Sequence, residues 1–240
     1  MPLATRLCLL AIVACFPAAA ADPPAKKTTQ AIAMVESSLK TADGHIRQFA
    51  LDGDANTYFA SEKDPVKDDH FTLTFDRQVI VKSVEVVTGR PGDGDVLAGG
   101  DELCTGELQV SADGKKFTPL GEFVKGTARG TPKGEVKAIR VWPDQHPRPL
   151  VIREIKIDSD PPVAVFKYPV EISLDVSDAP EMKEWGEKVV RICEGAYPMI
   201  NDELKSDGFK PATLITMTLK KDYRGVAATG GTRITGSAKF

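Results

Sequence analysis

The sequence predicts a mainly β protein: a β-sandwich of the jelly-roll type followed by an incomplete α+β unit. Three observations predict it. Short runs alternate apolar and polar residues, as residues 71–75 do, which is typical of strands with one buried face. The chain holds 20 Gly and 17 Pro, enough for many turns between such strands. The best helical pattern, at residues 179–206, comes late in the chain.

The bulk composition is that of an ordinary globular protein. Of the 240 residues, 42% are hydrophobic and 27% are charged, which argues against a disordered tail or a collagen-like rod as the main body. The formal net charge is -3. Because nucleic-acid binders need a strongly basic face, we expect no nucleic-acid partner.

Residues 1–21 have the pattern of a signal peptide. Arg6 provides a positive start, residues 7–16 form a short apolar core, and four alanines at 18–21 suit a cleavage site. The apolar run is short for a membrane-spanning helix. The protein is therefore expected to be exported.

A second interpretation of this leader stays open. Residues 12–15 resemble a bacterial lipobox, which would leave the protein lipid-anchored through Cys15. Residues 22–30 follow as a polar linker. Beyond the leader only Cys104 and Cys193 remain, and they fall in different predicted domains. Export permits a disulfide, but the sequence leaves open whether these two cysteines pair.

The first domain, residues 31–159, is read as a series of strands. Asp113-Gly114 is a hairpin signal between two of them. Short strands at this spacing are typical of a sandwich or jelly roll. The strand-like segments are residues 71–75, 79–87, 108–111, 116–117, 136–142 and 151–157.

The character of the sequence changes after Pro161-Pro162, because two prolines disfavour continued sheet pairing. A second unit is therefore assigned to residues 160–240. It is expected to contain strands at 170–176 and 212–219, a turn at Gly230-Gly231 and a short strand around Ile234.

The helix of the second unit has predicted ends and a predicted face. Asp178 and Glu181 are spaced as a capping box, and Asp207-Gly208 is a stop signal. We expect its apolar stripe to pack into the core rather than on a membrane. The stripe consists of Met182, Trp185, Val189, Ile192, Cys193, Ala196 and Ile200.

The loop at residues 49–61 suggests a cation site. Asp52 and Asp54 place two hard oxygen ligands on one tight turn, with Gly53 between them, and calcium prefers such oxygens. The alternative is an ordinary Asx turn, in which an Asp side chain accepts a bond from a nearby backbone amide.

This loop, the segment 106–117 and the strand 152–157 together resemble the discoidin, or coagulation factor 5/8 type C, family. The resemblance implies a discoidin-type sandwich with a structural calcium. Its implied ligands are the side chains of Asp52, Asp54 and Glu154, with Ala50 and Thr57 contributing through the loop.

The same resemblance implies binding of a glycan or cell-surface polymer on loops at one end of the sandwich. The candidates are Tyr58, Trp142 and His146, with Phe59 beside them. A buried ring is the other reading, because Phe59 matches a core position of the family and Trp142 continues a strand. His146 lies on a loop, where a lone His is more often solvated than a ligand.

Residues 160–240 resemble the start of the basic secretory protein family of plants and bacteria. The resemblance is carried by the helix with its cap, Tyr197-Pro198, Asp207-Gly208-Phe209, the strand that follows and the segment 230–237. That family is similar to the zincin metallopeptidases, whose members carry a His-Glu-x-x-His-like motif. The three His of this chain, His45, His70 and His146, all lie in the first domain. No catalytic residue is assigned, and zinc is expected only if the protein continues past Phe240.

These readings give one expected function and one alternative. The first is an exported glycan-binding module joined to the start of a secreted zinc metallopeptidase, whose complete form would act on a peptide substrate. The alternative is a non-catalytic, secreted or lipid-anchored adhesion protein. In either case we expect these 240 residues to bind without hydrolysis.

Overall fold

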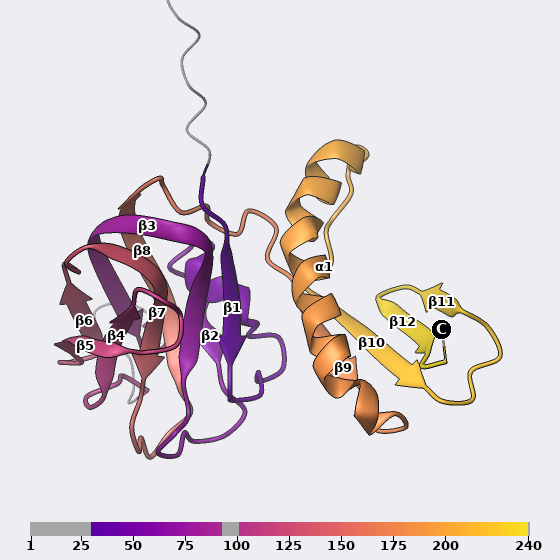
Figure 1. The fold of residues 1–240 in the computed structure, drawn as a ribbon, viewed down its shortest axis with the longest axis horizontal. Helices are drawn as coiled ribbons and strands as arrows, with labels where there is room; N and C mark the ends of the chain where they lie inside the picture. The colour runs from indigo at the N-terminus through magenta and orange to yellow at the C-terminus, as the bar shows by residue number, and fades with distance from the viewer. Residues whose placement is uncertain (1–29, 93–100, 240) are drawn as a thin grey trace, which may run out of the picture.

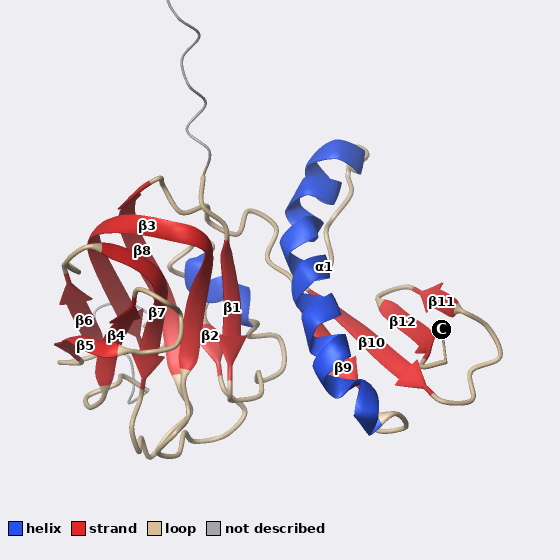
Figure 2. Ribbon diagram, viewed as in Figure 1, coloured by secondary structure: helices blue, strands red, loops and turns tan. Residues whose placement is uncertain are grey.

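A computed structural model describes residues 30–92 and 101–239 of the chain. They form two units side by side: a β-sandwich, and a smaller sheet with one long helix (Figures 1 and 2). The prediction of a mainly β protein with a sandwich is confirmed. The predicted signal peptide, the Cys15 anchor and most of the predicted linker lie outside the described residues.

The sandwich contains the first eight strands. Its main path runs in the order β2-β8-β3-β7-β4-β5, and β1 and β6 also pair with β3. The elements are β1 (Ala33–Ser37), the 3-10 helix η1 (Arg47–Leu51), β2 (Phe59–Ala60), β3 (Phe71–Thr88), β4 (Glu107–Ser111), β5 (Thr118–Glu122), β6 (Thr127–Gly130), β7 (Glu135–Trp142) and β8 (Val151–Asp160).

The strand β3 replaces two predicted strands. It runs without interruption for 18 residues, and a register shift against β7 between Thr74 and Val79 marks an irregularity. Its first part pairs with β1 and β7, and its last part pairs with β6 and β8. The polar residues 76–78, which suggested a break between strands, are exposed at this irregularity.

The strand ends place most of the long loops at one end of the sandwich. Phe71 at the start of β3 pairs with Val141 near the end of β7, and Thr88 at the end of β3 pairs with Ile152 near the start of β8. Only residues 143–150 join β7 to β8, so the two ends of β3 lie on the same side of the sandwich. The segments that precede β3, follow β3 and join β7 to β8 leave the sandwich on this side. We call this side the loop end.

The second unit is a four-stranded sheet with the order β11-β12-β10-β9. Strands β9 and β10 are parallel and are joined through α1, so they form a βαβ unit. The elements are β9 (Glu171–Asp175), the 3-10 helix η2 (Pro180–Met182), α1 (Lys183–Leu204), β10 (Leu214–Lys220), β11 (Ala227–Gly230) and β12 (Arg233–Ser237).

The predicted capping box is wrong. A 3-10 turn precedes α1, which begins at Lys183, and no side chain caps either helix start. A carboxylate oxygen of Asp178 instead accepts a bond from the backbone amide of Lys221, 3.1 Å away. The helix also ends at Leu204, before the predicted stop at Asp207-Gly208.

The predicted buried face of α1 is also wrong. The helix buries Gly186, Val190, Glu194 and Asn201. Trp185 and Ile192, which were expected in the core, are 50% and 69% exposed. Helical periodicity shows that a helix has an apolar stripe, but it does not show which side faces the sheet.

Candidate functional site

A cluster of polar and aromatic side chains lies at the loop end, where Tyr58 leads into β2. The Tyr58 ring stacks on the His45 ring with 4.1 Å between centroids and 17° between planes. The Tyr58 hydroxyl is also 3.2 Å from Nε2 of His45. Both side chains are half-buried. We call these two residues, with Arg90, the Tyr58 cluster.

Arg90 joins the cluster from the loop after β3. Its guanidinium carbon is 5.8 Å from the Tyr58 ring centroid, and its Nε is 2.5 Å from a carboxylate oxygen of Asp101. Arg153 on β8 fixes this loop by donating to the carbonyls of Gly89 and Arg90, at 3.0 and 2.7 Å. Two loops and a strand therefore hold the cluster in place.

The electrostatics of the cluster favour a neutral imidazole. Burial lowers the pKa of His45, and the charge of Arg90 lowers it further. The hydrogen bond to Asp101 raises the pKa of Arg90. The cluster therefore offers a charged guanidinium, a neutral imidazole and a phenol within one small area.

The sequence analysis found only one member of this cluster. It named Tyr58, but it did not assign a role to His45 or Arg90, which lie 13 residues before and 32 residues after Tyr58. No short motif links them. Only the pairing of strand ends at the loop end brings them together.

The other residues that were considered for ligand binding either tie elements of the sandwich together or lie buried in it. The indole nitrogen of Trp142 donates to the carbonyl of Lys67 at 2.8 Å, which ties β7 to the loop before β3. Phe59 is fully buried, as the core interpretation predicted. His146 lies on a loop but is only 8% exposed, so the expectation of a solvated His is wrong.

The predicted calcium loop is a tight turn stabilised by side chains. A carboxylate oxygen of Asp52 accepts from the amide of Asp54 at 3.0 Å, and the Thr57 hydroxyl lies 2.8 Å from its other oxygen. Asp54 accepts from both the amide and the side chain of Asn56, at 2.9 Å. These are the bonds of Asx turns, and they direct the two carboxylates to different partners.

Glu154 lies close to this loop from β8. It is only 5% exposed, and burial together with the nearby Asp52 charge raises its pKa to about 7. A buried carboxylate beside a second carboxylate is a suitable environment for a hard cation. Among the described residues, however, no group of three or more His, Cys, Asp or Glu is arranged to hold a metal. Ala50, also predicted at this site, is fully buried in η1.

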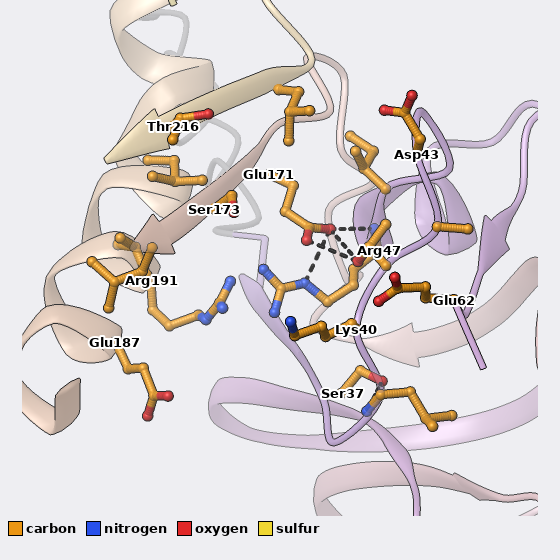
Figure 3. A pocket seen from close by; sticks show the side chains of 18 of the residues that line it. Ser37, Lys40, Asp43, Arg47, Glu62, Glu171, Ser173, Glu187, Arg191 and Thr216 are labelled. Carbon is orange, nitrogen blue, oxygen red and sulfur yellow. Dashed lines mark hydrogen bonds and ion pairs between the residues drawn. The ribbon is translucent and has the colours of Figure 1, made fainter. Parts of the chain in front are cut away.

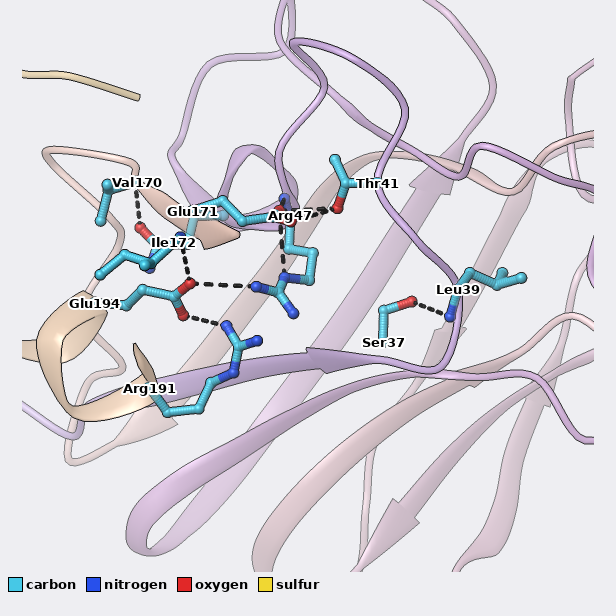
Figure 4. A network of polar contacts seen from close by, with 10 residues as sticks. Ser37, Leu39, Thr41, Arg47, Val170, Glu171, Ile172, Arg191 and Glu194 are labelled. Carbon is cyan, nitrogen blue, oxygen red and sulfur yellow. Dashed lines mark hydrogen bonds and ion pairs between the residues drawn. The ribbon is translucent and has the colours of Figure 1, made fainter. Parts of the chain in front are cut away.

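A buried polar network joins the two units. Glu171 at the start of β9 accepts from the Thr41 hydroxyl at 2.8 Å and from the Arg47 amide at 3.0 Å (Figure 4). The Arg47 guanidinium lies 3.3 Å from Glu171 and 3.2 Å from Glu194 on α1. Burial lowers the pKa of Arg47, while the charge of Glu171 raises it.

Side chains also occupy amide groups of the edge strand β9. The Val170 amide, just before the strand, donates to the side-chain oxygen of Gln48, and the Ile172 amide donates to Glu194, both at 2.8 Å. Arg191 pairs with the other oxygen of Glu194. Part of this strand edge is therefore blocked against pairing with another strand.

A cleft of about 730 Å³ lies beside this network, between the sandwich and α1 (Figure 3). Lys40, Arg47 and Arg191 line it together with Glu62 and Glu187. Among its described lining residues there is no His, Cys or aromatic side chain. It therefore lacks the His and Cys ligands typical of a catalytic zinc site and the rings that stack on sugars.

Neither cysteine forms a disulfide within the described residues: Cys104 is exposed and Cys193 is half-buried. No helix in the part of the chain that the structure describes is long and apolar enough to cross a membrane.

No protein-family model and no curated protein sequence matches this chain. Among solved structures, it is similar to the first family 32 carbohydrate-binding module of a Clostridium perfringens family 31 glycoside hydrolase, with 14% identity and a TM-score of 0.43 over 52% of this chain and 92% of the other. It is also similar to the lectin domain of lectinolysin complexed with Lewis B antigen, with 17% identity and a TM-score of 0.42 over 52% of this chain and 90% of the other. A third similar structure is a Clostridium perfringens family 32 carbohydrate-binding module in complex with galactose, with 14% identity and a TM-score of 0.42 over 53% of this chain and 97% of the other.

Proposed function

We propose that the first domain is a glycan-binding module of an exported protein and that the Tyr58 cluster is its binding site. The observation that carries the proposal is the half-exposed Tyr58–His45 stack beside the Arg90 guanidinium at the loop end. The resemblance of the sequence to the discoidin family supports the same location.

The chemistry of the cluster suits a sugar. A sugar ring has apolar C–H faces, which pack on aromatic rings, and hydroxyls, which need fixed donors and acceptors. Tyr58 and His45 supply aromatic surface, and Arg90 supplies N–H donors. Because Arg153 and Asp101 fix the position of Arg90, little side-chain entropy would be lost on binding.

A calcium ion bound by Asp52 and Glu154 would have a structural role in this proposal. When bound, it would neutralise the two carboxylates and hold the loop at 52–57 against β8. Asp54 and Thr57 are less available for it, because their side chains already form bonds within the turn. The remaining ligands would have to be backbone carbonyls and water.

The peptidase part of the function depends on the sequence resemblance alone. Residues 160–240 contain no His, so this second unit offers no paired-His zinc site. We propose that in this chain the second unit packs against the binding module and does not hydrolyse peptides. Incubation of the purified chain with casein and zinc tests this: appearance of peptide fragments would contradict it.

The glycan proposal is tested by screening the chain on a glycan array that includes galactose and Lewis b. We expect binding to at least one glycan, and at least tenfold weaker binding for Tyr58→Ala and Arg90→Ala, which corresponds to about 1.4 kcal/mol. Tyr223→Ala, at another half-buried tyrosine in the second unit, is the matched control and should bind normally. An array without signal, or equal binding by Tyr58→Ala, would refute the proposal.

A further inference from the structure

The exposed face of α1 has the heptad pattern of a coiled-coil seam. Apolar residues recur at alternating intervals of three and four, which is the spacing of helices that pack against each other lengthwise. We call these residues the α1 seam: Met182, Trp185, Val189, Ile192, Ala196 and Met199. Met182 lies in the turn just before the helix.

The seam lies on the side of α1 away from the residues that the helix buries, and three of its six members are exposed. The buried residues Val190, Glu194 and Asn201 lie on the opposite side of α1, where Glu194 bonds to Arg47 and the β9 amide. Trp185, Ile192 and Met199 are 50%, 69% and 64% exposed. A continuous apolar strip on a helix of about 33 Å is typical of a surface that another protein covers.

We propose that the α1 seam is a homodimer interface, in which α1 of a second copy packs antiparallel about a two-fold axis near Glu194. In this register the seam residues within α1 face complementary ones. Ile192 lies opposite Ala196 of the second copy, so a large side chain meets a small one. Val189 lies opposite Met199. At each end Trp185 lies opposite Glu203, which can accept a bond from the indole N–H.

The charges beside the seam are complementary in the same register. Lys188 on one helix lies opposite Asp202 on the other, twice per dimer. Their present partners are Glu184, 2.8 Å from Lys188, and Lys167, 2.7 Å from Asp202. Both pairs are on the surface, where ion pairs contribute little and can be shared. Gly195 lies between them on the same flank, so the backbones can approach closely at the axis.

This complementarity favours a second copy over other occupants. A lipid surface would place the carboxylates of Glu203 and Asp202, at one end of the strip, against lipid. A two-fold dimer satisfies these groups with residues of the same chain, as isologous interfaces do. The dimer would also present two Tyr58 clusters, so that two weak glycan contacts combine into tighter attachment to a surface.

The first test is the mass of the exported chain by light scattering, from about 1 to about 200 µM, because small interfaces are weak. We expect a monomer–dimer equilibrium that Ile192→Asp abolishes. Ile80→Asp, at a 54% exposed Ile on β3, is the matched control and should dimerise normally. Circular dichroism checks that both variants fold.

The second test uses Cys193, which in this register lies beside Cys193 of the second copy. In a Cys104→Ser variant, mild oxidation should give a disulfide-linked dimer, and in a variant that carries both Cys104→Ser and Cys193→Ser it should not. A monomer at every concentration with no Cys193 cross-link would overturn the proposal. Flotation of a monomeric chain with phosphatidylcholine vesicles would overturn it in favour of a membrane.

Discussion

Nη2 of Arg47 in the sandwich lies 3.2 Å from Oε1 of Glu194 on α1, with about one tenth of either side chain exposed. The same carboxylate oxygen accepts the Ile172 amide of β9. One residue of the first unit is thus bound to both the helix and the sheet of the second. We therefore expect the unfolding of the two units to be coupled.

Arg47→Met should therefore destabilise the protein and uncouple its units. Removing the guanidinium leaves the buried carboxylate of Glu171 without a cation and leaves Glu194 with Arg191 as its remaining cation, which costs about 3–5 kcal/mol. The chain has two Trp, Trp142 in the first unit and Trp185 in the second, so variants with a single Trp report each unit separately. In urea, the two transitions should coincide in the parent and separate in Arg47→Met.

The control for this experiment is Lys82→Ala. Lys82 pairs with Asp158 at 3.5 Å on the surface, with 60% and 62% of the two side chains exposed. Such a pair contributes about 0–1 kcal/mol. If Arg47→Met has the same small effect as Lys82→Ala, the network does not couple the two units.

Truncation of Tyr58 should mainly weaken glycan binding, whereas truncation of its neighbour Phe59 should mainly lower the free energy of unfolding. Phe59 is fully buried, with its ring centroid 4.9 Å from that of Phe71, so Phe59→Ala should lower the free energy of unfolding by about 3–5 kcal/mol. Tyr58→Ala should weaken glycan binding and cost less stability. Thermal melts of both variants check this, and equal losses of stability would mean that Tyr58 is a core residue.

The strands were predictable because a half-buried strand must alternate. Phe71-Thr72-Leu73 and Val136-Lys137-Ala138 show this pattern, and each became part of a strand. The two segments of β3 could not be joined from sequence, because the polar residues between them resemble a turn. The start of α1 was missed because Asp178 bonds to Lys221, far along the chain.

The polar network and the Tyr58 cluster depend on contacts between distant residues. Arg47 and Glu194 are separated by 147 positions, and neither lies in a motif. Sequence patterns report local geometry, so they predicted the turn at Asp52 but not the partners of Arg47. The orientation of α1 was missed for the same reason: its buried side is defined by Arg47 and β9.

The calcium prediction has a pH signature at Glu154. Its pKa is raised from 4.5 to about 7. The protonated form of Glu154 therefore contributes fully to the free energy of unfolding below about pH 4.5, and this contribution is lost as pH rises through about 7. Without calcium this loss amounts to about 3 kcal/mol at most. Calcium should reverse it, because the ion requires both carboxylates to be charged.

Melting temperatures at pH 5 and pH 8, with calcium or with a chelator, test this. We expect calcium to stabilise the parent at pH 8 and to have little effect at pH 5. Glu154→Gln should lose both the calcium response and the pH dependence that Glu154 causes. Glu135→Gln, at an exposed residue on β7, is the control and should keep both. A parent that is indifferent to calcium at pH 8 would show that the turn binds no ion.

His146 should give the opposite dependence on pH. Burial lowers its pKa from 6.5, and its Nε2 is buried without a hydrogen-bond partner among the described residues. The folded state therefore favours the neutral ring, and the unfolded state binds the proton more tightly. The free energy of unfolding should consequently fall as pH drops below about 6.5.

His146→Phe keeps an aromatic ring without this proton, so the fall between pH 6.5 and pH 5 should be smaller. His70→Phe, at a half-exposed His, serves as the comparison and should fall as the parent does. If His146→Phe falls as steeply as the parent, then the ring is protonated in the folded protein, and its loop opens to water.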